Sequence, residues 1–486
     1  MSTSAITTEN LLPGTNMWQF NKLASTRMQA YADKTAYNPG DTVTFFVSVQ
    51  VNGTLYNLNI YRLGWYRGTG GCLKYTNNGL TGVAQGVWDN SSQTLIGGSA
   101  LIDSSTHLCD ANYSASTTWV IPGGACTGVY MAQFTDANGY QCACTFVVRG
   151  SVTSDYVVSR GYTTDAAYNS WGGYSLYTNP TVGTKVSFNR PNLSNGGASN
   201  VLAYDLTAIH WLEMMGYDLA YISDIDLHTS GTNPLLMHKA YLSLGHDEYW
   251  TKEMRANVLA ARDASVGLGF LGANAIYWQC RLENDAASNA NRTVVCYKVT
   301  TAANNLATDP LYGVDNTRVT TNWRDAVLNL PENALIGMMY SDNSNTGNFA
   351  WTVDSNAGSL GIVAGTGLTP GQSYGFDLVG YEWDRITNNG LTPTGIQTIA
   401  TSATVGVAGV GNSNTTLYQA ASGAWVFATG SIGWMGALDP YRYNPQAGGY
   451  PTVIQPMKQL MVNVMTKLLA AKTPTSVQYG SFLLHA

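Results

Sequence analysis

The stretch that decides the fold runs from residue 240 to residue 264 and reads AYLSLGHDEYWTKEMRANVLAARDA. It begins with a short apolar run, residues 240–244, which is typical of a buried strand. Thr251 can then cap a helix that carries Glu253 in its first turn and that we expect to end near Ala264. A strand followed directly by a helix predicts one unit of a parallel sheet.

The same alternation continues on both sides of this unit. Apolar runs at residues 156–159, 219–222 and 268–271 predict three more strands. Residues 201–215 have apolar side chains near helical spacing and stop at Gly216. A closing amphipathic helix is predicted from Met457, Leu460, Val464 and Leu468. Alternating strands and helices predict an α/β domain with a parallel sheet and right-handed crossovers.

The first third of the chain has a different pattern. Residues 42–51 are rich in β-branched and aromatic side chains and are followed by an Asn52-Gly53 turn signal. Later strand-like pieces follow at the spacing of a sandwich, which predicts an immunoglobulin-like β-sandwich. We therefore expect four segments: an N-terminal extension (1–35), the sandwich (36–150), the α/β domain (151–475) and a tail (476–486).

Composition narrows the class of protein. The 486 residues are 45% apolar, which indicates a globular chain, but only 11% charged, less than half of the usual quarter or so. Such a surface is commoner in secreted, cell-surface or virion-associated proteins, so we expect an extracellular or surface-associated location, although no signal peptide is visible. The net charge is −6 with no basic stripe, which argues against a nucleic-acid partner. No apolar run has the ~18–20 residues of a membrane span.

The seven cysteines indicate buried or bridged thiols and not a metal site. Five of them lie before residue 150, which would suit one or two disulfides in an oxidising compartment. No Cys-x-x-Cys pair with zinc spacing occurs.

Polar and aromatic residues gather after four of the predicted strands. Because ligands of an open parallel sheet bind outside the carboxyl ends of its strands, these loops predict one cleft. For any single Tyr or Trp, gap filling is the ordinary explanation, and His246-Asp247-Glu248 also fits a charged helix cap. The residues expected to line the cleft are Trp171, Asp247, Tyr249, Trp250, Tyr277 and Trp278.

The residues of the strand-to-helix turn favour one kind of chemistry. His246, Asp247 and Glu248 stand where a nucleophile-elbow hydrolase would have Ser or Cys, which disfavours an acyl-enzyme. No zinc-protease spacing and no phosphate-binding glycine loop occur. The remaining donors are carboxylates and phenols, which suit a hard ion such as Fe(III). Such an ion would polarise a carbonyl and lower the pKa of a bound water.

Several motifs in register resemble a known family. The sequence has Tyr-Asn-x-Trp-Gly-Gly-x-Ser-Leu-Tyr at 168–177, Gly-His-Asp-Glu-Tyr-Trp at 245–250 and Gly-Ala-Asn-x-x-Tyr-Trp at 272–278. With residues 211–218 and 223–228, their order resembles the large (beta) subunit of N,N-dimethylformamidase and its relatives, across residues 36–470. The resemblance implies a glutamine-amidotransferase-like α/β domain and a mononuclear Fe(III) held by two tyrosines and one glutamate. It also implies hydrolysis of the C–N bond of a small amide.

The family motifs also imply roles for individual residues. Glu248 and Tyr168 match two of the metal ligands, and Tyr130, at the end of the sandwich, is the best match for the third. His246 or Glu382 is expected to move the proton to the leaving amine. Asn274 is expected to donate a hydrogen bond to the developing oxyanion. Lys298 is the nearest match for a site lysine, with Arg292 as its competitor.

Some features depart from the family and leave alternatives open. Asp247 replaces an expected proline, and the chain is shorter than the characterised amidase subunit. A homo-oligomer and a small accessory subunit both stay open as partners besides the amide substrate. The alternative function is a non-catalytic extracellular or virion-associated binding or structural protein. A third is glycan hydrolysis by Glu248 and Glu382, which requires the two carboxylates to lie roughly 5–9.5 Å apart.

Overall fold

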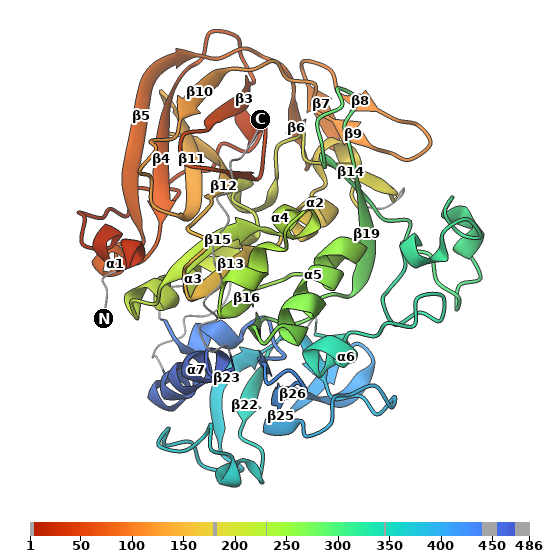
Figure 1. Cartoon of the computed structure of the whole chain (residues 1–486). Coiled ribbons are helices and arrows are strands. Elements are labelled where there is room, and N and C mark those ends of the chain that lie inside the picture. Colours follow the sequence, from red (N-terminus) through yellow and green to blue (C-terminus); the bar gives the residue numbers. More distant parts are fainter. Residues whose placement is uncertain (1–3, 178–181, 230, 345–346, 440–453, 472–486) are drawn as a thin grey trace.

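The computed structural model describes residues 4–177, 182–229, 231–344, 347–439 and 454–471 (Figure 1). The protein is rich in β-structure, with 34% of the residues in strands and 20% in helices. The tail expected at 476–486 lies outside the described residues. No helix of the described chain is long and apolar enough to cross a membrane.

Two facing sheets form a sandwich in the first third of the chain. One sheet has the order β1-β3-β10, and the other has the order β2-β12-β11-β4-β5. Aromatic rings fill the space between them, with Phe45 edge-on to Phe134 at 5.7 Å between ring centroids. Strand β1 begins before residue 36, so the sandwich takes up part of the segment expected as an extension. The strands are β1 (Met28–Ala32), β2 (Ala36–Tyr37), β3 (Thr42–Val49), β4 (Leu55–Leu63), β5 (Gly71–Thr81), β10 (Thr117–Val120), β11 (Gly128–Asp136) and β12 (Gln141–Val148).

The rest of the chain is built on a seven-stranded sheet with the order β15-β13-β16-β18-β27-β26-β25. The first five strands pair in parallel, as the alternating pattern predicts, and a long antiparallel hairpin completes the sheet. The four strands predicted from apolar runs all form. The strands are β13 (Tyr156–Arg160), β15 (Leu219–Ser223), β16 (Ala240–Leu244), β18 (Gly267–Leu271), β25 (Gln397–Gly406), β26 (Gly409–Gln419) and β27 (Trp425–Ala428).

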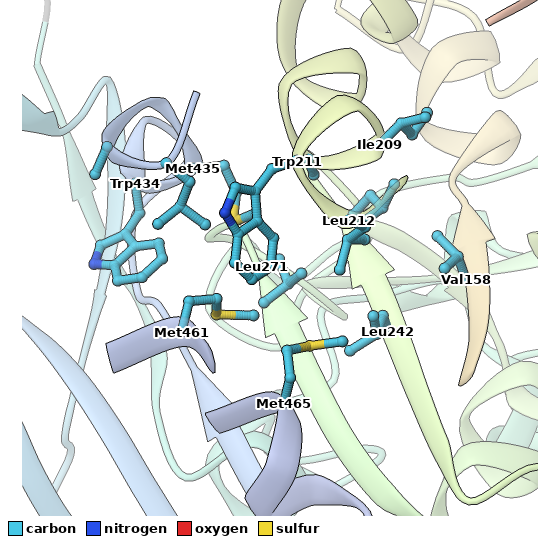
Figure 2. Packing of buried hydrophobic residues seen from close by; sticks show 14 of the residues in the cluster. Val158, Ile209, Trp211, Leu212, Leu242, Leu271, Trp434, Met435, Met461 and Met465 are labelled. Atoms are coloured by element: carbon cyan, nitrogen blue, oxygen red, sulfur yellow. The ribbon is translucent and has the colours of Figure 1, made fainter. Parts of the chain in front are cut away.

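Helices cover both faces of this sheet. Helices α3 (Leu206–Met214) and α7 (Gln455–Leu468) pack on one face, where Met465 lies beside Leu242 of β16 and Trp211 lies beside Leu271 of β18 (Figure 2). Helices α4 (Asp224–His228) and α5 (Lys252–Asp263) pack on the other, against Tyr241. Neighbouring residues 241 and 242 point to opposite faces because side chains alternate along a strand. Each such buried apolar side chain contributes about 1.5–3 kcal/mol.

The predicted cap of α5 is present. The Thr251 hydroxyl accepts a hydrogen bond from the backbone N–H of Met254 at 3.2 Å, and Glu253 lies in the first turn. The helix ends at Asp263, one residue before the expected end. Local sequence is therefore enough to start and stop this helix.

Shorter elements surround the carboxyl ends of the parallel strands. A four-stranded sheet has the order β14-β20-β19-β17, and two-stranded pairs join β21 to β24 and β22 to β23. Helix α2 directly follows β13. Their bounds are α2 (Tyr162–Tyr168), β14 (Lys185–Ser187), β17 (Tyr249–Thr251), β19 (Trp278–Glu283), β20 (Thr293–Val295), β21 (Met339–Asn343), β22 (Phe349–Thr352), β23 (Ser373–Val379) and β24 (Glu382–Arg385). The remaining α-helices and strands are α1 (Ala5–Glu9), α6 (Asn333–Ile336), and the pairs β6 (Val87–Asp89) with β7 (Thr94–Ile96) and β8 (Leu101–Ile102) with β9 (Cys109–Asp110). A π-helical turn over Val201–Asp205 leads into α3.

The sandwich and the parallel sheet share one apolar core. Residues of the outer face of the sandwich, among them Leu63 and Met131, belong to the same buried cluster as Leu212 of α3. A buried ion pair crosses this contact, where the Arg62 guanidinium lies 2.7 Å from the Glu213 carboxylate and both side chains are fully buried. The two parts are therefore packed as one body.

All seven cysteines are free thiols, and six of them are buried. The disulfides that an oxidising compartment would favour are not formed, and the buried thiols agree with the ordinary explanation.

Candidate functional site

A buried carboxylate that accepts two phenols is the centre of the candidate site. Glu248, in the turn after β16, is 2% exposed. Tyr168, at the end of α2, donates a hydrogen bond to Glu248 Oε2 at 2.7 Å, and Tyr177 donates to Oε1 at 2.8 Å. The two phenol rings stack with their centroids 4.3 Å apart. They are 37% and 42% exposed, so the phenols lie between the buried carboxylate and solvent.

The turn that carries Glu248 is held in place by α2 and by a glycine. The backbone N–H groups of Glu248 and Tyr249 donate to Thr164 Oγ1 at 2.9 and 3.2 Å. Gly245 has a φ of +57°, and a Cβ at this position would come within 2.6 Å of Asp205 Oδ1. Glycine is the residue that fits this conformation and this space. Gly245 therefore fixes the path of the backbone from the end of β16 to Glu248.

His246 lies between two carboxylates. Its Nε2 is 3.4 Å from Glu248 Oε2 and 3.2 Å from Glu382 Oε2. Burial lowers the pKa of His246, but Glu382 and Glu248 outweigh burial and raise the pKa to about 10. Burial also raises the pKa of Glu248, but His246, Lys298 and Tyr168 together outweigh burial and lower the pKa of that carboxyl group. The three groups therefore hold an imidazolium between two carboxylates.

Asn274 and Glu382 lie next to His246. Asn274 Nδ2 donates to Glu382 Oε2 at 3.1 Å, and the backbone N–H of Asn274 donates to Asp384 Oδ1 at 2.8 Å. The Oδ1 atom of Asn274 is buried and has no hydrogen-bond partner among the described residues. Asn274 thus fixes the Glu382 carboxylate beside His246.

Among the described residues, Lys298 is the lysine whose ammonium group lies at the candidate site. Its Nζ lies 3.1 Å from the centroid of the Tyr177 ring, and 5.4 and 5.3 Å from the rings of Tyr249 and Trp278. Burial lowers the pKa of Lys298 to about 8, against the opposing effect of Glu248. Arg292, the competing match, lies elsewhere, with its Nε donating to Asn189 Oδ1 at 2.9 Å.

The aromatic residues expected in the cleft divide into two groups. Tyr249 donates to the Tyr177 hydroxyl at 2.6 Å, and Tyr277 lies edge-to-face with Trp278 next to Lys298. Trp171 instead is fully buried and donates from Nε1 to Gln29 of the sandwich at 2.8 Å.

Trp250 and Asp247 also point away from the phenols. Trp250 is 1% exposed and belongs to the core beneath α5, near Phe270. Asp247 is buried and accepts a hydrogen bond from Ser243 at 2.7 Å. For Asp247 the alternation of side chains explains this, because it stands between His246 and Glu248 and takes the other side of the chain. Trp250 points away because it packs in the core beneath α5.

Tyr130 requires a correction. It is 1% exposed in the sandwich core, stacks on Phe146 and donates its hydroxyl to the carbonyl of Cys126 at 2.7 Å. In β11, Tyr130, Ala132 and Phe134 all point into the sandwich, whereas Met131 points to the parallel sheet. The second phenol at Glu248 comes from Tyr177 instead.

Sequence reasoning missed three tyrosines. Tyr177 closes the Tyr-Asn-x-Trp-Gly-Gly-x-Ser-Leu-Tyr motif, so its place in the motif could have singled it out. Tyr381 precedes Glu382, and its hydroxyl lies 3.4 Å from His246 Nδ1. Tyr204 has no motif and reaches the site only through the contact of its ring with Tyr381, 6.4 Å between centroids.

The donor set fits a hard metal ion. No group of three or more His, Cys, Asp or Glu among the described residues could hold a metal, so a metal here depends on the phenols. Tyr168, Tyr177 and Glu248 supply two phenol oxygens and a carboxylate that already converge, and hard oxygen donors suit Fe(III). The residues present therefore fit such an ion.

Comparison with curated sequences and solved structures shows little similarity. No curated protein sequence matches the chain. A glucanotransferase structure from Paenibacillus sp. is 12% identical with a TM-score of 0.17, over 50% of this chain and 44% of that one. The sporulation control protein Spo0M from Bacillus subtilis is 12% identical with a TM-score of 0.15, over 25% and 47%. The chain thus spans less than half the length of either structure.

The model of one protein family covers most of the chain. The family described as "N,N-dimethylformamidase beta subunit-like, C-terminal" matches residues 57–448. The match includes every residue of the candidate site, from Tyr168 to Glu382. The chain therefore belongs to the N,N-dimethylformamidase beta subunit-like family.

Proposed function

We propose that the protein hydrolyses the C–N bond of a small amide and that Tyr168, Tyr177 and Glu248 hold a mononuclear Fe(III). The observation that carries the proposal is the convergence of two phenols on the two oxygens of one buried carboxylate. Family membership supports the dimethylformamidase-like reaction class. In the same proposal, residues 36–150 form an immunoglobulin-like sandwich and residues 151–475 an amidotransferase-like domain.

The phenols by themselves stay protonated. Burial, and next the charge of Glu248, raise the pKa of Tyr168 and of Tyr177 far above the ordinary value of a phenol. When bound, Fe(III) would supply a Lewis acid that polarises a carbonyl and lowers the pKa of a water. Release of both phenol protons is therefore the expected sign of metal binding.

The other residues of the site handle protons and charge. His246 carries a proton between Glu248 and Glu382 and can donate it to the leaving amine. The second N–H of the Asn274 amide is free to donate to the developing oxyanion. The Lys298 ammonium above the Tyr177 ring favours a negative charge on that phenol.

Loading the protein with ferric ion tests the proposal. Wild-type protein should take up one iron and show a tyrosinate charge-transfer band in the visible spectrum. Tyr168→Phe and Tyr177→Phe should each weaken or shift the band and abolish hydrolysis of formamides. Tyr130→Phe is the matched control, because its phenol lies in the sandwich core. A folded protein that takes up no iron and stays colourless would contradict the proposal.

The second candidate is a non-catalytic, extracellular or surface-associated binding protein. Its supporting observation is the surface chemistry of the chain, with only 11% charged residues. Iron uptake without turnover of any amide in a panel of formamides and acetamides would favour it. Glycan hydrolysis is less well supported, because the His246 imidazole lies between the carboxylates that a sugar ring would have to separate.

A further inference from the structure

A cavity lies between the sandwich and the elements α2 and β14, apart from the candidate site. Its volume is about 80 Å³, and residues from β1, β12, α2 and β14 line it together with Arg190 and Arg292. A single water needs about 10–15 Å³ of such space. The cavity therefore has room for several waters or for one small polyatomic ion.

Arg292 contributes a buried positive charge to this cavity. It is 6% exposed, and its hydrogen bonds go to Asn189 and, at 3.3 Å, to the carbonyl of Ala32. Within the part of the chain that the structure describes, no carboxylate forms an ion pair with it; Asp33 and Asp285 act on it from a distance. Burial lowers the pKa of Arg292, and Asp33, Asp285 and Asp110 compensate its charge only from a distance.

Arg190 contributes a second buried positive charge to the cavity. It is 3% exposed, and its terminal nitrogens donate to the carbonyls of Trp171, Tyr174 and Asn169 at 2.7–2.8 Å. Its Nε is buried without a geometric hydrogen bond among the described residues. The Cys109 thiol and Asp110 lie near the guanidinium and act on its charge, but no described carboxylate forms an ion pair with it. Backbone carbonyls orient this cation but do not neutralise it.

The other lining groups add hydrogen-bond donors and no free anion. Tyr162 Oη is buried and has no hydrogen-bond partner within the described ranges. Ser199 Oγ accepts from Asn192 at 3.3 Å, which leaves the hydroxyl hydrogen of Ser199 free to donate. Asp165 is the carboxylate on the lining, and it is paired with Arg160.

We infer that this cavity binds a small inorganic oxyanion, of the phosphate or sulfate class, between Arg190 and Arg292. Two guanidinium groups without carboxylate partners match the charge of such an ion, and their planar N–H groups match its oxygens. The hydroxyls of Tyr162 and Ser199 supply further donors. Because β1 and β12 belong to the sandwich and α2 to the α/β part, the bound ion joins the two.

Thermal unfolding of the full chain measures the effect. Inorganic phosphate or sulfate should raise Tm by about 3 °C or more over chloride at equal ionic strength, once the ion is in large excess over Kd. Arg292→Met should lose this difference while folding as well as the wild type in chloride, because the variant removes an uncompensated buried charge. Arg281→Met is the matched control. Its guanidinium is paired with Asp309 at 2.9 Å, so this variant should keep the anion-dependent rise.

Direct titration tests the same site without a change of charge. Tyr162→Phe removes a hydroxyl and should weaken phosphate binding, measured by calorimetry, about tenfold or more. Equal Tm values in phosphate, sulfate and chloride would overturn the inference. So would an undiminished phosphate effect in Arg292→Met, since the ion would then bind elsewhere. These outcomes do not bear on the proposed iron binding by Tyr168 and Tyr177, which the iron-loading experiment tests separately.

Discussion

Glu248 has both of its carboxylate oxygens occupied by phenols, and one of them also faces His246. A buried carboxylate stays ionised only with such partners, and clusters of perturbed ionisable groups are typical of functional sites. The arrangement separates two tasks, because the phenols and Glu248 can hold an ion while His246 and Glu382 move a proton.

Glu382→Gln tests the second task alone. Loss of the carboxylate next to His246 should lower kcat by about 10²–10⁴-fold, because the proton on the imidazole is no longer held for the leaving amine. Iron content and the charge-transfer band should stay as in the wild type, since Glu382 is not among the proposed ligands. Glu283→Gln, on a partly exposed ion pair with Lys185, is the control and should leave kcat unchanged. Joint loss of iron and activity in Glu382→Gln would contradict the division of tasks.

Individual site residues were predictable where they lie within motifs. Glu248, His246, Asn274, Glu382 and Lys298 all follow from the family pattern, and the structure brings them together. The prediction of Tyr130 as a metal ligand was wrong because the direction of its side chain depends on which face of β11 packs in the sandwich core. Strand alternation alone gives two faces and does not say which of them meets the other sheet.

Helix α5 shows how far local sequence determines an element. Its cap, its first-turn acid and its end agree with the prediction, because hydrogen bonds within one turn decide them. The hairpin β25–β26 was less predictable. Its Thr-, Asn- and Gly-rich strands lack the apolar run of a buried strand, and they join the parallel strands only through the antiparallel pairing of β26 with β27.

The first turn of α5 also carries a pH-dependent ion pair. Glu253 faces Arg318 and His228, and the hydrogen bond from His228 is the main cause that lowers the pKa of Glu253 to about 2. The pair should therefore stabilise the protein above about pH 4.5, the ordinary pKa of a glutamate. Its contribution should disappear as the pH falls towards 2.

Glu253→Gln measures this contribution. At neutral pH the variant should lose about 0.2–1 kcal/mol of unfolding free energy, because the pair is partly exposed. The difference from the wild type should shrink steadily below about pH 4.5. Urea unfolding at several pH values gives both numbers. A difference that does not change with pH would show that helix capping, and not the ion pair, causes it.

At the scale of the molecule, the contact between the sandwich and α3 depends on the buried pair of Arg62 and Glu213. Asn10 and Tyr221 also donate to the Glu213 carboxylate, at 2.9 and 3.0 Å. Sequence analysis did not foresee this contact, because the two charged residues lie 151 positions apart and Arg62, unlike Glu213, belongs to no motif.

Glu213→Gln should destabilise the protein by about 3–5 kcal/mol, because it leaves the Arg62 charge buried without a counter-charge. Glu283→Gln breaks a partly exposed pair and should cost only about 0.2–1 kcal/mol. Denaturant unfolding of the two variants provides the comparison. Similar costs would mean that water reaches Arg62 in the folded protein.

The shared cluster of Leu63, Met131 and Leu212 has a consequence for anyone who divides the chain. Cleavage at residue 150 would expose, on each half, the apolar surface that now packs against the other half. Fragments ending or starting there would aggregate or stay partly molten, and heating the intact chain would melt both halves in a single cooperative step.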